Sequence, residues 1–295
     1  MMEDAEYALC LTHDVDRPYK TYQSLYYAIT ERDPSHLRSL APGANPYWQF
    51  ETVMELEEEL GVRSAFYFLN EKHLFREKSP TDWFRLENWK RYIGRYDIES
   101  PEMVDVIQTL DDGGWEIGLH GSYESYTDPE RLKYEKEALE DVLGHSITGC
   151  RQHYLNLSIP ETWRYHREIG FQYDASLGAK TEYGFKYGDD VKHPFDDEFA
   201  VFPLTIMEVG LPGVSTDIEG AWEECRRILD EAGERQAVVT ILWHLRMFNE
   251  QEFPGYRRLY RRIVEYALEQ GAWVGPPEEL YEEIVQEGTT PNTLG

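Results

Sequence analysis

Strand-like apolar runs alternate with helical segments along most of the chain, and this alternation limits the possible folds more than any other feature. The run YALCLTH at 7–13 is almost continuously apolar, which is typical of a strand covered on both faces. Helical apolar spacing follows at 47–60, and the next strand-like run lies at 63–69. About eight such repeats in one chain predict a parallel α/β barrel rather than a doubly wound sheet. The other strands are expected at 115–121, 147–154, 171–176, 199–206, 237–244 and 272–276, and the other helices at 101–112, 128–144, 160–169, 219–232, 256–270 and 277–286.

The sequence contains no linker, low-complexity segment or internal repeat, so we expect a single domain over residues 1–295. Two long, aromatic-rich stretches, 17–46 and 71–98, follow the first and second strands as insertions. In a parallel barrel such insertions belong to the loops that leave the carboxyl ends of the strands, where barrel enzymes hold their active sites. These insertions are therefore expected to shape a pocket.

Acidic residues dominate the composition, with 56 Asp and Glu against 29 Lys and Arg and a formal net charge of −27. The excess is spread along the chain, which indicates a solvated acidic surface rather than an acidic tail. Such a surface repels nucleic acid and anionic membranes, so we expect neither as a partner. It resembles the surfaces of halophilic proteins, in which counterions screen the self-repulsion, and it predicts unfolding at low salt.

The chain has no apolar stretch of 18 or more residues and begins without a secretory signal pattern. We therefore expect no membrane span and a location in a high-salt cytoplasm. The three cysteines, Cys10, Cys150 and Cys225, are too few and too scattered for a disulfide framework, and we interpret them as reduced core thiols. The sequence leaves the oligomeric state open.

Polar side chains end most of the predicted strands. In a closed parallel barrel these strand ends converge on one rim, so residues far apart in sequence could surround a single point. A lone histidine at a strand end is usually structural, but a whole set of metal- or proton-competent groups is harder to explain in that way. The set consists of Asp14 and Asp16, His120, Arg151 and His153, Asp174, and His244.

Five short segments occur in a characteristic order: THDVD (12–16), GLHGSYES (118–125), GCRQHYL (149–155), YDASLG (173–178) and ILWH (241–244). In this order and spacing they resemble the five motifs of polysaccharide deacetylases of the NodB-homology type, carbohydrate esterase family 4. PLTIME at 203–208, after GFKYG at 184–188, is also similar to a subgroup associated with surface polysaccharides. The resemblance implies a distorted (β/α)7, TIM-like barrel.

The resemblance also implies a role for each matching residue. Asp14 matches the catalytic base, and Arg151 matches the arginine that pairs with it. His244 matches the acid that protonates the leaving amine, and Asp174 matches the aspartate that orients this acid or completes the groove. Asp16 and His120 match two metal ligands.

Amide hydrolysis suits these residue types. A bound Zn²⁺, or another divalent metal, lowers the pKa of water to roughly 7 and polarises the acyl carbonyl. An amine leaves only when it is protonated, which suits a histidine acid. A neighbouring arginine would keep the base Asp14 ionised.

The second motif departs from the family pattern, because Glu124 stands where a second histidine ligand is expected. Glu124 could coordinate through oxygen if the segment turns helically, which would place it beside His120. His153 lies two residues after Arg151, so on an extended segment both side chains would face the barrel mouth. We favour His153 as the third ligand, with Glu124 or a water as the alternatives.

Some residues of these motifs could contact a sugar. We expect Tyr123, Tyr154, Ser122 and Trp243 to bind substrate, although most aromatic residues in such a chain are core. By contrast His13, one residue before Asp14, should face the opposite side of its strand and be structural.

Three functions remain open. The first is a metal-dependent hydrolase that removes N-acetyl or O-acyl groups from an amino sugar of a polysaccharide, glycolipid or lipid-linked precursor. The second is a catalytically silent barrel that binds glycan or scaffolds an assembly, an alternative suggested by the missing second histidine. The third keeps the chemistry but acts on a non-sugar amide or cyclic ureide.

Overall fold

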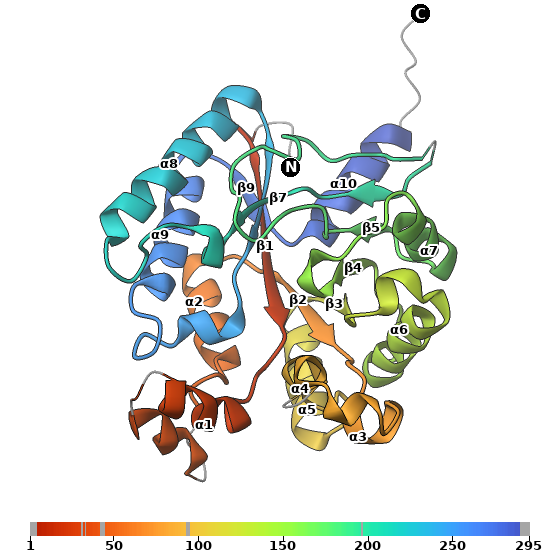
Figure 1. Cartoon of the computed structure of the whole chain (residues 1–295). Helices are drawn as coiled ribbons and strands as arrows, with labels where there is room; N and C mark the ends of the chain where they lie inside the picture. The colour runs from red at the N-terminus through yellow and green to blue at the C-terminus, as the bar shows by residue number, and fades with distance from the viewer. Residues whose placement is uncertain are drawn as a thin grey trace, which may run out of the picture.

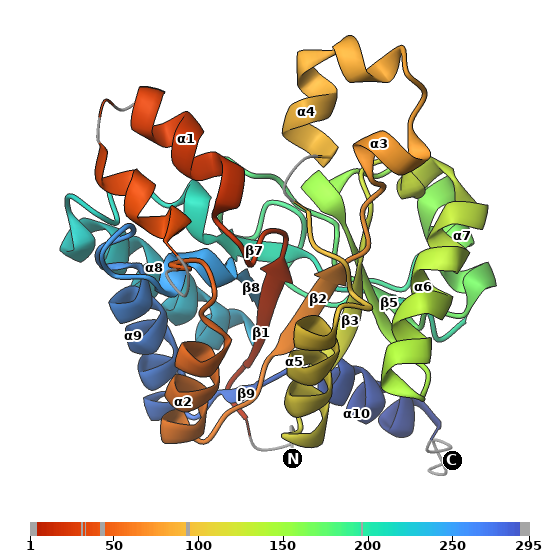
Figure 2. The same ribbon diagram turned by 90° about the horizontal axis from the view of Figure 1, so that it is seen from below.

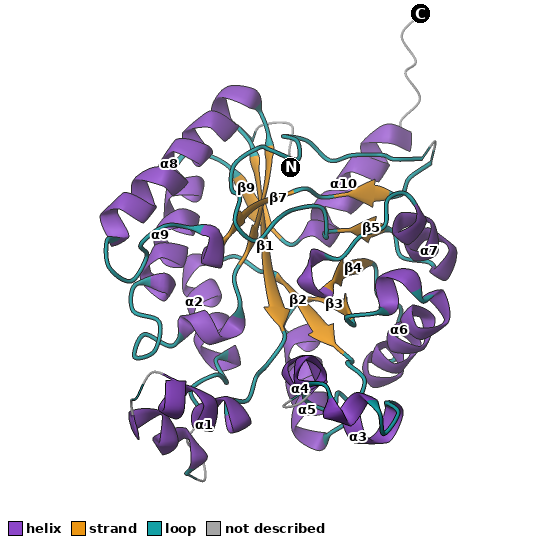
Figure 3. Ribbon diagram, in the orientation of Figure 1, coloured by secondary structure: helices purple, strands orange, loops and turns teal. Residues whose placement is uncertain are grey.

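A computed structural model describes residues 5–30, 32, 34–41, 45–92, 95–195 and 197–289. Its nine strands form one sheet in the order β6-β5-β4-β3-β2-β1-β8-β7, with β9 paired to β1, and every ladder is parallel. The sheet curls into a half-barrel with helices outside it (Figures 1 and 3), which confirms the predicted α/β, TIM-like class. The strands are β1 (Ala8–Val15), β2 (Ala65–Leu69), β3 (Glu116–Gly121), β4 (Gly149–Gln152), β5 (Tyr173–Asp174), β6 (Ala200–Val201), β7 (Leu204–Met207), β8 (Val238–Leu242) and β9 (Trp273–Gly275).

Helices cover the outer face of the sheet. In Figure 1, α2, α8 and α9 lie on one side and α5, α6 and α7 on the other. The exposed sides of these helices are charged, and their apolar sides pack on the sheet; α9, for example, buries Leu259, Ile263 and Ala267 at helical spacing. The helices are α1 (Thr21–Thr30), α2 (Phe50–Leu60), α3 (Leu74–Glu77), α4 (Leu86–Tyr92), α5 (Pro101–Asp112), α6 (Pro129–Leu143), α7 (Glu161–Ile169), α8 (Ile218–Arg235), α9 (Tyr256–Glu269) and α10 (Pro277–Thr289).

The two faces of β1 belong to different cores. Leu9 and Leu11 point outward into the large cluster shared with the helices, whereas Ala8 and Cys10 point into the barrel. The interior cluster also contains Leu280 of α10, and this helix lies at the end of the barrel opposite α1 and α4 (Figure 2). Because side chains alternate along a strand, Thr12 and Asp14 continue the inward face toward the open end.

The run 199–206 was expected to be one strand but forms two, β6 and β7. Pro203 separates them because it has no N–H to donate to a ladder. β6 and β7 are the two ends of the sheet order, so the chain at Phe202–Pro203 connects the edges of the curled sheet. The break therefore carries the following residues to the side of β8. Strands β4 and β5 are also shorter than the predicted runs 147–154 and 171–176.

Both predicted insertions lie at the carboxyl ends of β1 and β2 (Figure 2). Residues 17–46 contain α1 and the 3₁₀ helix η2 (Pro34–Leu40), and residues 71–98 contain α3, η3 (Asp82–Phe84) and α4. The other 3₁₀ helices are η4 (Ser125–Thr127), η5 (His153–Leu155), η6 (Glu208–Gly210) and η7 (Leu245–Phe248). Among the described residues, no helix is both long and apolar enough to cross a membrane.

Candidate active site

Side chains from the carboxyl ends of four strands meet at one pocket. Asp14 lies near the end of β1 and His120 near the end of β3, while Asp16, His153 and His244 follow β1, β4 and β8. All five line a pocket of about 250 Å³. The pocket is somewhat smaller than the roughly 300–1,000 Å³ of typical ligand sites, which suits a small chemical group or a single sugar unit better than a long chain.

Asp14 and Arg151 form a buried pair beside the pocket. Arg151 Nη1 donates to Asp14 Oδ1 at 3.0 Å and to Thr12 Oγ1 at 2.8 Å, and its Nε donates to the carbonyl of Ala175 at 2.8 Å. Burial alone would raise the pKa of Asp14, but His120, Arg151 and His244 together lower it below its usual value. Asp14 is therefore a fixed, ionised carboxylate at the pocket wall.

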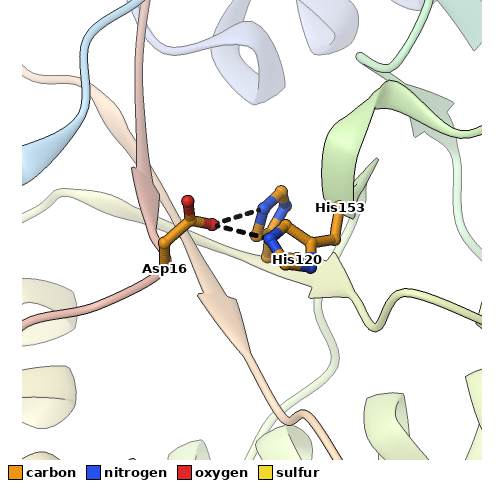
Figure 4. Close-up of side chains that lie close together, drawn as sticks. All are labelled: Asp16, His120 and His153. Carbon is orange, nitrogen blue, oxygen red and sulfur yellow. Dashed lines mark hydrogen bonds and ion pairs between the residues drawn. The ribbon is translucent and has the colours of Figure 1, made fainter. Parts of the chain in front are cut away.

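Asp16, His120 and His153 converge on one point (Figure 4), with one ligand atom of each within 4.8 Å of the others. Asp16 Oδ1 lies 3.1 Å from His120 Nε2 and 3.5 Å from His153 Nε2. One carboxylate oxygen and two imidazole nitrogens form a donor set that suits Zn²⁺ and similar divalent metals.

The hydrogen bonds behind the histidines favour a cation at this point. His120 Nδ1 donates to the carbonyl of Arg151 at 2.9 Å, so Nε2 of the neutral ring turns a lone pair toward Asp16. That approach of a lone pair to a carboxylate requires a proton or a metal ion between the two atoms. Without a metal, the nearby Asp14 and Asp16 more than offset burial and raise the pKa of His120, which supplies the proton.

His153 is held in a complementary way. Burial is the main cause that lowers its pKa, to about 4, so the ring is neutral as a metal ligand must be. Its Nδ1 lies 3.6 Å from Glu71 Oε2, an arrangement like the carboxylate–histidine–metal units that orient ligands in metalloproteins. The residues present therefore fit a divalent metal.

His244 lines the same pocket. Its Nε2 lies 3.6 Å from Asp16 Oδ2, and its Nδ1 donates to the buried Glu208 Oε1 at 2.5 Å. Burial would lower the pKa of His244, but the Glu208 carboxylate raises it, and the net shift is upward. The pair therefore directs a protonated nitrogen toward the pocket.

Asp174 was expected to orient His244 or to complete the groove, and the structure shows neither contact. Asp174 is fully buried and accepts hydrogen bonds from Trp163 Nε1 and from the backbone N–H and hydroxyl of Ser176, while His166 Nδ1 lies 3.2 Å away. It ties β5 to α7 and does not line the pocket. Glu208 occupies the orienting position because Pro203 places β7 beside β8.

Glu124 points away from the ligand cluster. Strand β3 ends at Gly121, and the helical turn that would bring Glu124 beside His120 does not form there. Its carboxylate instead accepts from Lys78 Nζ at 2.6 Å, Lys72 Nζ at 3.2 Å and the Tyr92 hydroxyl at 3.1 Å, which joins the second insertion to the end of β3. His153 and not Glu124 completes the cluster.

Of the four residues expected to bind substrate, only Tyr154 lines the pocket, and it is 44% exposed. Trp243 and Ser122 are buried, and Trp243 packs on Tyr260, because it faces the outer helices as His13 does. The ring of Tyr123 lies under Arg91, outside the pocket lining. Those three expectations are not met by the geometry.

Sequence reasoning missed Glu71 and Glu208, the carboxylates behind His153 and His244. Glu71 follows β2 as Asp16 follows β1, so the strand-end pattern could have found it. Glu208 ends the segment PLTIME, but it could be placed only after the break at Pro203 is known.

No protein-family model and no curated protein sequence matches this chain significantly. Solved structures do match: a protein from Mycobacterium smegmatis described as a polysaccharide deacetylase has a TM-score of 0.64 at 17% identity, covering 99% of this chain and 94% of its own. A second such protein, from Pseudomonas aeruginosa PAO1, has a TM-score of 0.64 at 14% identity, covering 97% and 93%. Puue allantoinase has a TM-score of 0.61 at 15% identity, covering 98% and 93%. The chain therefore has the fold of these proteins, as the motifs predicted.

Proposed function

We propose that this chain, which shares its fold with proteins described as polysaccharide deacetylases, is a metal-dependent hydrolase that removes N-acetyl or O-acyl groups from an amino sugar. One observation carries the proposal: the Asp14–Arg151 pair, the three-residue ligand cluster and the His244–Glu208 pair all border a single pocket. A base, a metal site and an acid are the components that amide hydrolysis by water requires.

Asp16, His120 and His153 would hold the metal. When bound there, a divalent ion lowers the pKa of water and withdraws charge from the acyl carbonyl. The carbonyl of Arg151 fixes the His120 ring from behind through a hydrogen bond, and the carboxylate of Glu71 lies 3.6 Å from His153 Nδ1. Both Nε2 atoms are turned toward Asp16.

Asp14 serves as the base. Its Oδ2 lies 3.6 Å from His120 Nε2, so it borders the ligand cluster without belonging to it. The lowered pKa keeps it ionised, and its hydrogen bond to Arg151 fixes Oδ1 while Oδ2 accepts the proton of the attacking water.

His244 serves as the acid. Its Nε2 carries a proton toward the nitrogen of the leaving amine, while Nδ1 stays bound to Glu208. The raised pKa favours the protonated form that this step consumes. After proton transfer the ring can be recharged from solvent, because the pocket is open to it.

Acetate release tests the proposal. Protein kept in molar KCl, as its −27 charge recommends, is incubated with N-acetylated amino sugars and oligosaccharides with and without Zn²⁺ or Co²⁺. We expect metal-dependent acetate release that Asp14→Asn abolishes and that Asp141→Asn, an exposed aspartate on α6, leaves intact. Normal turnover by Asp14→Asn would remove Asp14 as the base, and no acetate from any acylated sugar would refute the function.

A second candidate follows from the fold that this chain shares with Puue allantoinase. The same base, metal site and acid could hydrolyse a cyclic ureide or another non-sugar amide. Release of ring-opened product from allantoin, with no acetate from sugars, would favour this candidate. The silent-barrel alternative loses support because His153 completes a ligand cluster where the second motif lacks its histidine.

We also retain the proposal of a salt-adapted protein in a high-salt cytoplasm, which rests on its charge alone. A melting temperature that does not change between dilute buffer and molar KCl would contradict it.

A further inference from the structure

Cationic side chains gather at the candidate active site from four separate loops. Arg17 follows β1, Arg95 lies near the end of the second insertion, Lys180 lies in the long segment between β5 and β6, and Arg246 lies in η7 after β8. All four line the pocket that contains the metal ligands. Residues more than 200 positions apart therefore bring the same charge to the same cavity.

This gathering runs against the composition of the whole chain. Overall, acidic residues outnumber basic ones, 56 to 29. In the pocket lining the ratio reverses, with the four cationic side chains facing two carboxylates, Asp14 and Asp16. A pocket lined by more cationic than anionic side chains, in an otherwise acidic protein, attracts an anionic ligand.

The two carboxylates of the lining have other close partners. Asp14 is bound by Arg151, and Asp16 faces the two histidines of the ligand cluster. In the part of the chain that the structure describes, no carboxylate lies within ion-pair distance of Lys180 or Arg246. Lys180 Nζ lies 3.5 Å from the centre of the Tyr154 ring, which holds it at the pocket edge.

The cations also repel one another. Arg17, Arg95 and Arg246 bring three positive charges into the lining of one pocket. Holding like charges together costs free energy that a bound anion would recover. A charge cluster of this kind is expected where the ligand carries a negative charge.

Neutral polar groups complete the lining. Gln23 and Tyr27 come from the first insertion, and Tyr47 follows it directly. Phenol and amide groups can form hydrogen bonds with the hydroxyl groups of a ligand. Hydroxyl recognition beside anion recognition is the pattern expected for an acidic sugar.

We propose that the substrate carries an anionic group, a carboxylate or a phosphate, close to its acylated position, and that Arg17, Lys180 and Arg246 bind that group. This inference rests on the proposed deacylase function and narrows its substrate class from amino sugars in general to acidic ones. The carboxylate of a uronic acid and the phosphate of a sugar ester share the chemistry that these side chains recognise.

Three probes of the same size class test the charge: N-acetylglucosamine, N-acetylglucosaminuronic acid and N-acetylglucosamine 1-phosphate. Their affinities are measured by calorimetry on metal-loaded Asp14→Asn protein, so that no turnover interferes. We expect at least one anionic probe to bind about tenfold or more tightly than the neutral one, because charge-assisted hydrogen bonds exceed neutral ones. The tighter of the two anions identifies the source of the charge.

Variants in the same background assign the effect to the pocket. Lys180→Gln and Arg246→Gln should each weaken anion binding about tenfold and change the affinity of the neutral probe by less than about twofold. Arg258→Gln, an exposed arginine on α9, is the matched control and should change neither. If a variant fails to fold, rising KCl on the unsubstituted pocket must weaken the anionic probes selectively.

Equal affinity for the neutral and anionic probes would overturn the inference. Acetate release by the wild-type protein distinguishes a failure of this inference from a failure of the proposed deacylase function. Release that is as fast from the neutral sugar as from the anionic ones upholds the deacylase and overturns the acidic substrate. Charge-selective binding that both variants remove, without acetate from any probe, upholds anion recognition and refutes the deacylase.

Discussion

Two buried histidine–glutamate pairs, His13–Glu57 and His244–Glu208, lie next to Trp243 and have different roles. His13 donates from Nδ1 to the carbonyl of Trp243 at 2.7 Å, and its Nε2 lies 3.0 Å from Glu57 Oε1. His244 also binds a buried carboxylate, that of Glu208, but its second nitrogen faces the pocket. The first ring has both nitrogens occupied, whereas the second keeps one for a ligand.

A buried histidine–glutamate pair can therefore be structural or catalytic. Its role depends on whether the second ring nitrogen is bonded within the protein or faces a pocket. The Glu57 carboxylate contacts three further side chains besides His13, because Ser64, Trp115 and Tyr260 donate to it at 2.9, 2.7 and 2.6 Å. It therefore fixes α2 against the sheet and α9. Glu208 binds a single histidine and controls where one proton points. Substitutions in the two pairs should separate stability from turnover.

Of the substitutions considered, Glu57→Gln should have the largest effect, and this effect should be a loss of stability against unfolding. Each oxygen of the Glu57 carboxylate has two buried partners, so the amide N–H₂ of glutamine would face two donors, and each donor left unpaired costs about 1–3 kcal/mol. Urea unfolding in fixed KCl measures the loss. The kcat of the protein that remains folded should stay near the wild-type value. A loss of kcat as large as in a Glu208 variant would erase the distinction between the two pairs.

Glu208→Gln should have the opposite effect, with a large loss of kcat and little loss of stability. The amide no longer stabilises a charged His244 or guarantees its orientation, so kcat should fall about 100-fold. The KM and the urea midpoint should change little, since the exchange is isosteric and only one hydrogen bond is altered. Glu208→Asp should recover part of the lost kcat, which a purely structural role would not predict. An unchanged kcat in Glu208→Gln would mean that His244 needs no partner.

Only one of the two pairs could be assigned its role from the sequence. Alternation along β1 correctly separates His13 from Asp14, and the same rule applied to β8 would have placed Trp243 with the outer core. Glu208 was inaccessible, because the apolar run 199–206 gives no sign of where the sheet is interrupted. Pro203 moves the residues after it to the other edge of the sheet, and only a three-dimensional structure shows which strand they join.

The metal cluster shows a similar division. Strand-end placement brought Asp16, His120 and His153 together in the prediction, and the structure holds them within ligand distance of one another. The choice between His153 and Glu124 depended on the backbone after β3, which sequence spacing does not determine. Two lysines of the second insertion capture Glu124, and insertions of irregular structure are the part of a fold that sequence patterns describe least.

Glu71 and His153 form a third pair. Like Glu208, Glu71 should affect function more than stability, but its substitution should have a smaller effect. Glu71→Gln removes the carboxylate behind the ring, so Zn²⁺ affinity should fall about 10- to 100-fold. Competition with a chelator measures this affinity directly and does not require turnover. Glu77→Gln, an exposed glutamate in the same insertion, serves as the control. Unchanged affinity in Glu71→Gln would place Glu71 with the structural carboxylates, beside Glu57.

The smallest expected effect is on the pH dependence of stability, and it concerns Glu116, a buried carboxylate that is not paired with a histidine among the described residues. Glu116 lies inside the barrel, where it accepts from the Tyr173 hydroxyl and from the Glu278 backbone N–H. Burial, with the Glu278 charge, raises its pKa to about 8. Because the folded state holds this proton more tightly than the unfolded chain, its contribution to stability is complete below about pH 4.5 and is lost as the pH rises through about 8. The urea midpoint of Glu116→Gln should therefore fall less between pH 5 and 8.5 than that of the wild type. Parallel curves for the two proteins would show that Glu116 is ionised in the fold, and that a buried carboxylate here needs no cationic partner.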